Sequence, residues 1–161
     1  MNQPVPVHAH SFTFALWINL NFIKNMKQEI AQIALVVKDY DEAISFYCKK
    51  LHFQLIEDTP LSPTKRWVLV SPPGSTGTKL LLAKAANEEQ LSRAGNQTGG
   101  RVFLFLHTDD FDRDYNNLLD NEVQIIREPS VEQYGKVAVF ADLYGNLWDI
   151  IGPNKLSQII G

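Results

Sequence analysis

The most restrictive feature of this 161-residue sequence is that one order of elements, a strand, a helix and three strands, occurs twice. In the first copy, apolar residues recur every three or four positions over 40–51, which predicts a helix. Apolar runs predict the strands of this copy at 30–37, 53–57, 66–70 and 79–83. A chain that repeats one unit in this way is expected to fold as two similar modules.

The second copy follows a polar segment, 84–100, in which a short helix is expected. Its helix is predicted at 109–122, and its strands are predicted at 101–107, 123–127, 136–141 and 146–152. The start of the first helix aligns with the second at an offset of 71, since Asp39 matches Asp110. The strand that follows aligns at an offset of 70, where "FQLIED" matches "VQIIRE".

These copies predict an α+β fold of two tandem βαβββ modules, at about 29–84 and 100–153. Together they are expected to make one domain of residues 26–155. At the start of the first helix, Asp39 occupies the N-cap position, with Glu42 three residues later as in a capping box. His52 follows the helix, where a residue in the left-handed conformation is expected to end it.

Composition excludes several classes of partner. The formal net charge of -3 provides no basic surface for phosphates, so neither DNA nor RNA is expected to bind. Cys48 is the only cysteine, so no intramolecular disulfide can form, which is typical of a reducing cytoplasm.

Residues 1–25 are expected to form an extension outside the fold. Their apolar stretch, 12–23, is too short and too polar to span a bilayer, and no Lys or Arg precedes Lys24 as a secretory signal would require. His8 and His10 in this extension are expected to be solvated. We therefore predict a cytoplasmic protein without a membrane partner.

Two segments of the chain are similar to motifs of one known family. "QIALVVKDYDEAISFYCKKLHFQLIED" resembles the opening strand, helix and second strand of the vicinal oxygen chelate superfamily, and "FADLYGNLWDIIGP" resembles its closing hairpin. This superfamily includes glyoxalase I, bleomycin resistance proteins, fosfomycin resistance enzymes and extradiol dioxygenases. The resemblance runs from about residue 29 to 153. It implies that each module curls into half a cup, and that the two modules form a curved, cup-like mixed sheet with helices on its outer face.

The resemblance also implies where a metal would lie. In the family, four positions on the floor of the cup hold one divalent ion, and here they fall on Gln32, Leu81, Phe103 and Asp149. Leu81 and Phe103 have no donor atom, and divalent ions require several oxygen or nitrogen ligands. We therefore expect no cofactor, although a weakly bound divalent metal would use Gln32 and Asp149. His107 lies about 13 Å along its strand from Phe103, at roughly 3.3 Å per residue, and is too far away to help.

The remaining candidate residues line the cup. Val36 stands where glyoxalase I has an arginine that pairs with the carboxylate of glutathione, so glutathione chemistry is disfavoured. Strand alternation places a mostly apolar set on the inner faces, and the substrate-binding candidates are Gln32, Val36, Leu81, Phe103, Phe105, His107 and Asp149.

The resemblance leaves two functions open. A metal-free module of the bleomycin-resistance type would hold an amphipathic small molecule in the apolar cup. A glyoxalase-like lyase or isomerase would use Asp149 as its catalytic base, with or without a weakly held metal. The sequence does not decide whether a reaction is catalysed. Because family members pair modules between two chains and sheets expose strand edges, a homodimer is expected.

Overall fold

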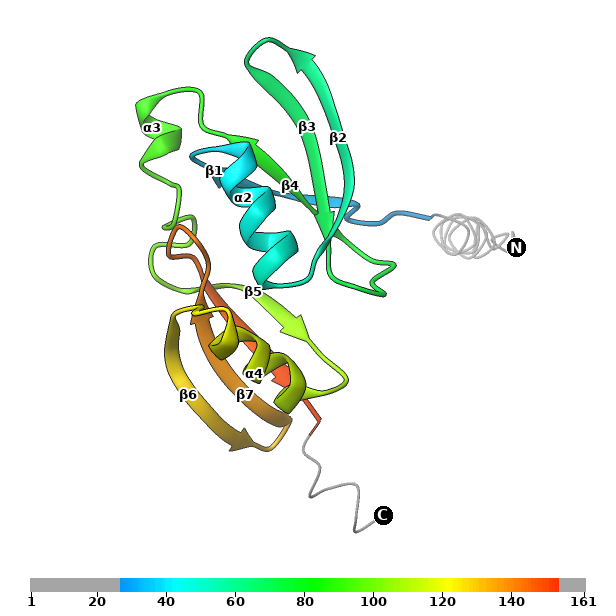
Figure 1. Ribbon diagram of the computed structural model, residues 1–161, viewed down its shortest axis with the longest axis vertical. Helices are drawn as coiled ribbons and strands as arrows, with labels where there is room; N and C mark the ends of the chain where they lie inside the picture. The colour runs from blue at the N-terminus through cyan, green and yellow to red at the C-terminus, as the bar shows by residue number, and fades with distance from the viewer. Residues whose placement is uncertain (1–26, 154–161) are drawn as a thin grey trace, which may run out of the picture. The chain divides into compact units, whose positions relative to one another are not determined.

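Each copy of the repeat forms a four-stranded mixed sheet, as Figure 1 shows. The computed structural model describes residues 27–153; the predicted extension, with His8 and His10, lies outside the described residues, as do 154–161. The first sheet has the strand order β1-β4-β3-β2, and its strands are β1 (Gln32–Val37), β2 (Gln54–Ser62), β3 (Lys65–Ser71) and β4 (Lys79–Lys84). The second sheet has the order β5-β8-β7-β6, and its strands are β5 (Val102–His107), β6 (Ile125–Glu132), β7 (Gly135–Ala141) and β8 (Leu147–Gly152). The prediction of two tandem βαβββ modules is confirmed.

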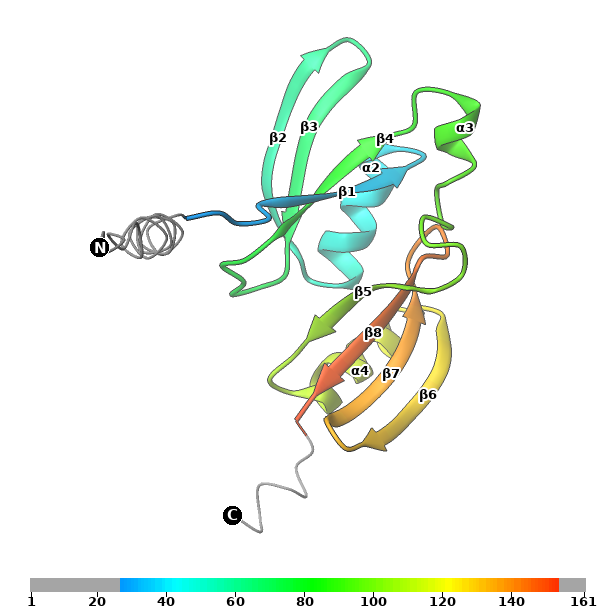
Figure 2. The ribbon, with the colours of Figure 1, turned by 180° about the vertical axis from the view of Figure 1, so that it is seen from behind.

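Helices cover one face of each sheet. The first module contains α2 (Tyr40–Ser45), which continues as a π-helical turn, η1 (Phe46–Lys50), and the second contains α4 (Phe111–Asp120). A short helix, α3 (Glu88–Leu91), lies in the segment between the modules. Figure 2 shows the opposite side of the molecule, where neither α2 nor α4 covers the strands. We call the face of each sheet without a helix its open face.

The ends of the first helix follow the sequence prediction. The side chain of Asp39 accepts hydrogen bonds from the backbone N–H groups of Asp41 and Glu42, at 2.9 and 3.3 Å, and so caps the helix. His52 has a φ of 57°, the left-handed conformation expected after the helix. The predicted single helix over 40–51 is wrong in one respect, since its last turn is π-helical.

Strands β2 and β6 are longer than predicted. Pro60 lies within β2 opposite Arg66, beyond residue 57, where the strand was predicted to end. Pro129 likewise lies within β6. Both strands are at the edges of their sheets, where a residue without an N–H group leaves no ladder hydrogen bond unmade.

Alternation along the strands separates a buried core from the open faces. In β1, Leu35 and Val37 are fully buried, whereas Ala34, which points to the opposite face, is exposed. In β8, Trp148 and Ile150 are buried whereas Asp149 is only partly buried. One apolar cluster of both modules contains these residues, and its aromatic members include Phe46, Tyr47, Phe53, Phe111, Phe140 and Trp148.

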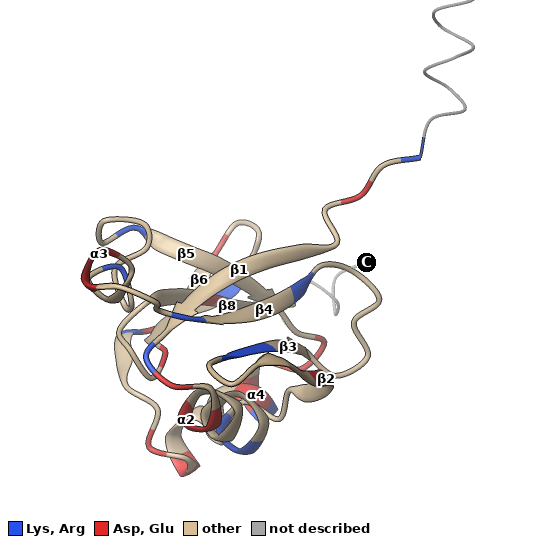
Figure 3. Ribbon diagram, turned by 90° about the horizontal axis from the view of Figure 1, so that it is seen from above, with Lys and Arg blue, Asp and Glu red and all other residues tan. Residues whose placement is uncertain are grey.

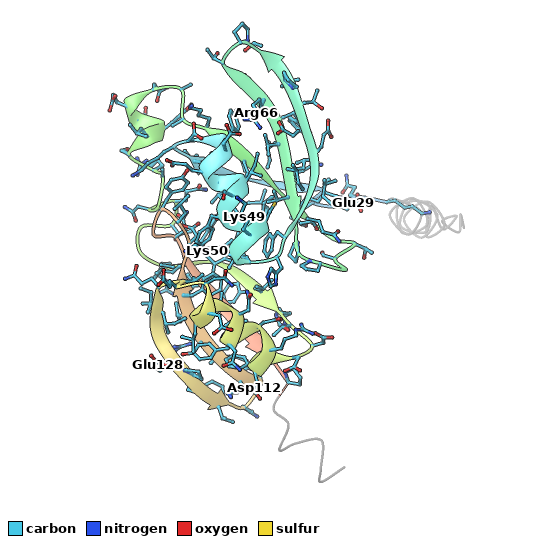
Figure 4. The ribbon with its side chains drawn as sticks, viewed as in Figure 1. Glu29, Lys49, Lys50, Arg66, Asp112 and Glu128 are labelled. Atoms are coloured by element: carbon cyan, nitrogen blue, oxygen red, sulfur yellow. The ribbon has the colours of Figure 1, made fainter. Side chains whose placement is uncertain are left out.

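A buried hydrogen bond joins the modules within this cluster. The Tyr47 hydroxyl donates to Asp142 Oδ2 at 2.7 Å, and both residues are almost inaccessible to solvent. At the surface nearby, Lys50 Nζ donates to the carbonyl of Asn121 at 2.8 Å, and Asn117 Nδ2 donates to the carbonyl of Lys50. Figure 4 labels Lys50 at this junction.

Removal of the Tyr47 hydroxyl tests this link. Tyr47→Phe is expected to lower the free energy of unfolding by about 1–3 kcal/mol at neutral pH, because Asp142 loses a buried donor. Chemical denaturation measures the change. Tyr134→Phe is the matched control, because Tyr134 is 68% exposed and its loss should be neutral.

The same variant tests the pH dependence. Burial raises the pKa of Tyr47 well above its ordinary value, and the Asp142 charge raises it further. The unfolded chain ionises near pH 10 while the folded hydroxyl stays protonated, so stability falls as the pH rises above about 10. This fall should be smaller in Tyr47→Phe, and an identical fall in both proteins would contradict the assignment.

Candidate functional site

The pairing of strands places the two modules in equivalent registers. Ala34 lies opposite Leu81 in the first sheet, and Phe105 lies opposite Asp149 in the second. Since Ala34 and Phe105 are 71 residues apart, as the helices are, Leu81 and Asp149 occupy equivalent positions. The offset of 71 is therefore reproduced at these two pairs. At the other end of the strands the registers differ: Gln32 lies opposite Lys79, but a bulge between Val102 and Leu104 places Val102 rather than Phe103 opposite Leu147.

A row of four residues crosses the open face of the second sheet. Asp149 in β8 has Phe105 opposite it in β5 and Val139 opposite it in β7, and Arg127 in β6 lies opposite Val139. Phe105 is 60% exposed, which is unusual for so large an apolar side chain. Strands β1 and β5 carry no charged residue, as their ribbons show in Figure 3. These two strands therefore add no charge to the open faces.

Asp149 is the principal polar group in this row. Its side chain is only 13% exposed, and its Oδ1 atom is buried without a hydrogen-bond partner among the described residues. The nearest cation is Arg127, whose Nη2 is 3.8 Å from that oxygen, too far for a hydrogen bond. A buried carboxylate oxygen in this state can accept a hydrogen bond from a ligand.

Arg127 is a site residue that the sequence did not indicate. Ile125 pairs with Phe140 in the core, so regular alternation would place Arg127 opposite Ala138, which also faces the core. A β-bulge between Ile125 and Arg127 shifts the register and places Arg127 on the open face instead. No residue pattern in the sequence marks this bulge.

The other candidate residues are spread over both modules. Gln32 is exposed, Leu81 and Phe103 are half-buried, and Val36 donates its N–H to the side chain of Gln97. Gln97 also donates to the carbonyl of Ala34, so its amide group covers part of the β1 edge.

Two pockets among the described residues each include one of these candidates. One, of about 600 Å³, is lined by His107 with His52, Asp114 and Asn117. The other, of about 990 Å³, has Leu81 among its lining residues. Neither pocket includes Gln32, Phe103, Phe105 or Asp149, and the charged side chain beside Asp149 is that of Arg127.

The donor atoms do not fit a resident divalent metal. Of the four family positions, Leu81 and Phe103 contribute only hydrocarbon, and Gln32 contributes a neutral amide. The carboxylate of Asp149 already lies beside a guanidinium group. Within residues 27–153, no group of three or more His, Cys, Asp or Glu side chains is arranged to hold a metal ion.

In the same range, none of the helices has both the length and the apolar character needed to cross a membrane.

Known proteins are similar to this chain in sequence and in fold. An uncharacterized protein of Shewanella frigidimarina (strain NCIMB 400) is 61% identical over 135 residues, which cover 83% of this chain and all of that protein. The crystal structure of TnmS3, an antibiotic binding protein from Streptomyces sp. CB03234, matches with a TM-score of 0.65 and 28% identity, and covers 81% of this chain and 98% of that one. A superfamily member from Sphaerobacter thermophilus DSM 20745 matches with a TM-score of 0.67 and 27% identity, over 79% of this chain and 98% of that one.

The family model of the Glyoxalase/Bleomycin resistance protein/Dioxygenase superfamily matches residues 29–150, which include both modules. The resemblance seen in the two sequence motifs is confirmed, and the chain belongs to this superfamily.

Proposed function

We propose that this protein binds an amphipathic small molecule on its open faces, without a resident metal. The observation that carries the proposal is the row on the second sheet, where a buried, unbonded carboxylate oxygen of Asp149 lies beside the exposed ring of Phe105. An apolar surface with few polar groups is typical of small-molecule sites. The fold similarity to TnmS3, described as an antibiotic binding protein, supports the same function.

The chemistry of the row defines the kind of ligand. Phe105 and the half-buried Phe103 would contact an apolar or aromatic part of the molecule, and Asp149 would accept a hydrogen bond from an amine or hydroxyl group. Arg127, which is half exposed, would contact an acceptor on the same ligand. The amphipathic character of the ligand follows from this combination.

A homodimer would complete the site. The candidate residues Gln32, Val36 and Leu81 lie on the first sheet, and family resemblance implies that modules of two chains pair with each other. Such a pairing would cover apolar side chains that are exposed in a single chain, including that of Phe105. Gln97 covers part of the β1 edge, so contact through that edge is disfavoured at residues 34–36.

A lyase or isomerase is the second candidate, and Asp149 is the observation that favours it. A carboxylate held in an apolar row can remove a proton from a substrate placed against Phe105. In that reaction Asp149 would be the catalytic base and Arg127 would stabilise developing negative charge.

Ligand binding is tested with metal-free bleomycin, since the family includes bleomycin resistance proteins. Calorimetric titration should show saturable binding that is weakened roughly tenfold or more by Phe105→Ala, because an apolar contact is lost. Asp149→Asn should weaken it by about 10–100-fold, because the charge-assisted hydrogen bond is removed. Tyr134→Ala, an exposed aromatic residue between β6 and β7, should bind like the unmodified protein. No saturable binding, or equal losses in all three variants, would argue against this site.

Divalent ions distinguish the two candidates. If the donor set is too poor for a metal, then Ni²⁺, Zn²⁺, Co²⁺ or Mn²⁺ should raise the melting temperature by less than about 1 °C. The enzyme candidate with a bound metal predicts a rise of more than about 2 °C that disappears in Asp149→Asn. Thermal-shift measurements on the full chain decide between them.

The dimer is tested by light scattering coupled to size-exclusion chromatography. The expected mass is twice that of one chain, and it should persist at micromolar concentration. A monomeric mass together with full bleomycin binding would show that one chain is sufficient for the site.

A further inference from the structure

The two modules differ at one equivalent place. In the second sheet, β7 and β8 pair along six positions, from Lys136–Gly152 to Ala141–Leu147. In the first sheet, β3 and β4 pair at only three positions, from Val68–Leu82 to Val70–Leu80. Beyond Val68 the two strands of the first sheet separate, and Figure 1 shows β2 and β3 leading away from the end of β4.

A difference in sequence between the modules, glycine at 152 and lysine at 84, explains the separation. A Cβ atom at Gly152 would lie 2.6 Å from the Cβ of Phe111, so β8 reaches its place beside α4 only because residue 152 is glycine. The equivalent of Gly152, 68 residues earlier, is Lys84, whose side chain excludes the same close approach to α2. The end of β4 must therefore lie further from β3.

Tyr40 holds the separated strand in place. It is the equivalent of Phe111 at an offset of 71, but it carries a hydroxyl group. That hydroxyl accepts from the backbone N–H of Arg66 and donates to its carbonyl, both at 3.2 Å. The backbone of the equivalent residue Lys136 lies opposite Gly152 in the closed ladder. Tyr40 thus replaces part of the missing strand pairing.

Most of the charged groups around the separation are paired, although Lys65, which also lines it, has no ion pair among the described residues. Arg66, labelled in Figure 4, contacts Asp41 at 2.7 Å and also Asp58, and lies over the ring of Tyr40 at 5.2 Å. Lys84 contacts Asp39 at 3.0 Å. These pairs balance positive and negative charge, so the space between the strands favours an uncharged molecule over an ion.

That space is the pocket of about 990 Å³, which we call the strand cleft. Its lining includes the half-buried indole of Trp67 and the side chains of Leu81 and Ala83. Hydrogen-bond donors also line it. The Ser62 hydroxyl accepts from the N–H groups of Thr64 and Lys65, so its own proton can be donated to another acceptor. The side chain of Gln90 accepts from the N–H of Ala86 through Oε1, so its NH₂ group can also donate.

We propose that the strand cleft is a second binding site, for a flat, uncharged aromatic molecule with carbonyl or ether oxygens at its edge. Two strands that diverge from one sheet enclose a flat space, and the Trp67 indole provides a surface on which an aromatic ring can stack. The donors of Ser62 and Gln90 would bind the edge oxygens. This site shares Leu81 with the function proposed above but uses neither Phe105 nor Asp149, so variants of those two residues distinguish the two proposals.

The test uses coumarin, a neutral flat lactone, and the indole N–H resonances of the ¹⁵N-labelled full chain. Trp67→Phe identifies the Trp67 resonance by its loss. Coumarin is expected to shift that resonance saturably, with a Kd no weaker than about 1 mM, and to leave the resonance of Trp148 in place because Trp148 is buried. Trp67→Ala should weaken binding at least tenfold.

Two further variants make the result decisive. Tyr40→Phe combined with Lys84→Gly reproduces the second module's residues and should close the strand cleft, with at least tenfold weaker coumarin binding and a retained cooperative unfolding transition. Phe105→Ala should bind coumarin like the unmodified protein. No saturable shift of the Trp67 resonance, or unchanged binding in Trp67→Ala, would overturn the proposal. Loss of binding in Phe105→Ala would also overturn it, because coumarin would then lie on the second sheet.

Discussion

The buried hydrogen bond between Tyr47 and Asp142 is the interaction on which the arrangement of the two modules depends. Asp142 also accepts from the backbone of the turn before β8 and from the side chain of Asn146, so one carboxylate organises that turn and receives the Tyr47 hydroxyl. Around it the ring of Trp148 packs against Tyr47, Phe53 and Phe140. Because these aromatic residues occupy the helix-covered faces, both modules bury those faces in one core and leave the open faces for ligands.

The repeat supplies two similar scaffolds, and single residues give each a separate character. On the second sheet, a carboxylate at the position equivalent to Leu81 introduces the polar group that a ligand can recognise. On the first sheet, Lys84 in place of glycine separates two strands and opens a pocket beside Trp67. In both modules a cation lies over the aromatic residue that begins the helix, Arg66 over Tyr40 and Lys136 over Phe111, which shows how closely the frameworks agree. The differences between the modules therefore arise from a few side chains on a backbone arrangement that both modules have.

Most of the fold could be predicted from the sequence, because it depends on local patterns. The period of apolar residues located the strands, and Asp39 and His52 marked the ends of the first helix. The candidate site could be predicted only in part, because it depends on register. A bulge moves Arg127 to the open face, and the separation of β3 from β4 involves contacts between distant residues, such as Tyr40 and Arg66, which are 26 positions apart. Neither feature has a local pattern. The predicted strand ended before Pro60 because the edge position that admits a proline is a property of the whole sheet.

A crystal structure of the full chain with metal-free bleomycin is the most direct test of the central claim, that the open face around Asp149 recognises an organic molecule rather than a metal ion. The account predicts the drug in contact with the Phe105 ring, with one of its donor groups about 3 Å from Asp149 Oδ1. A divalent ion held by Gln32 and Asp149, or a drug bound away from both sheets with Asp149 still unbonded, would contradict it.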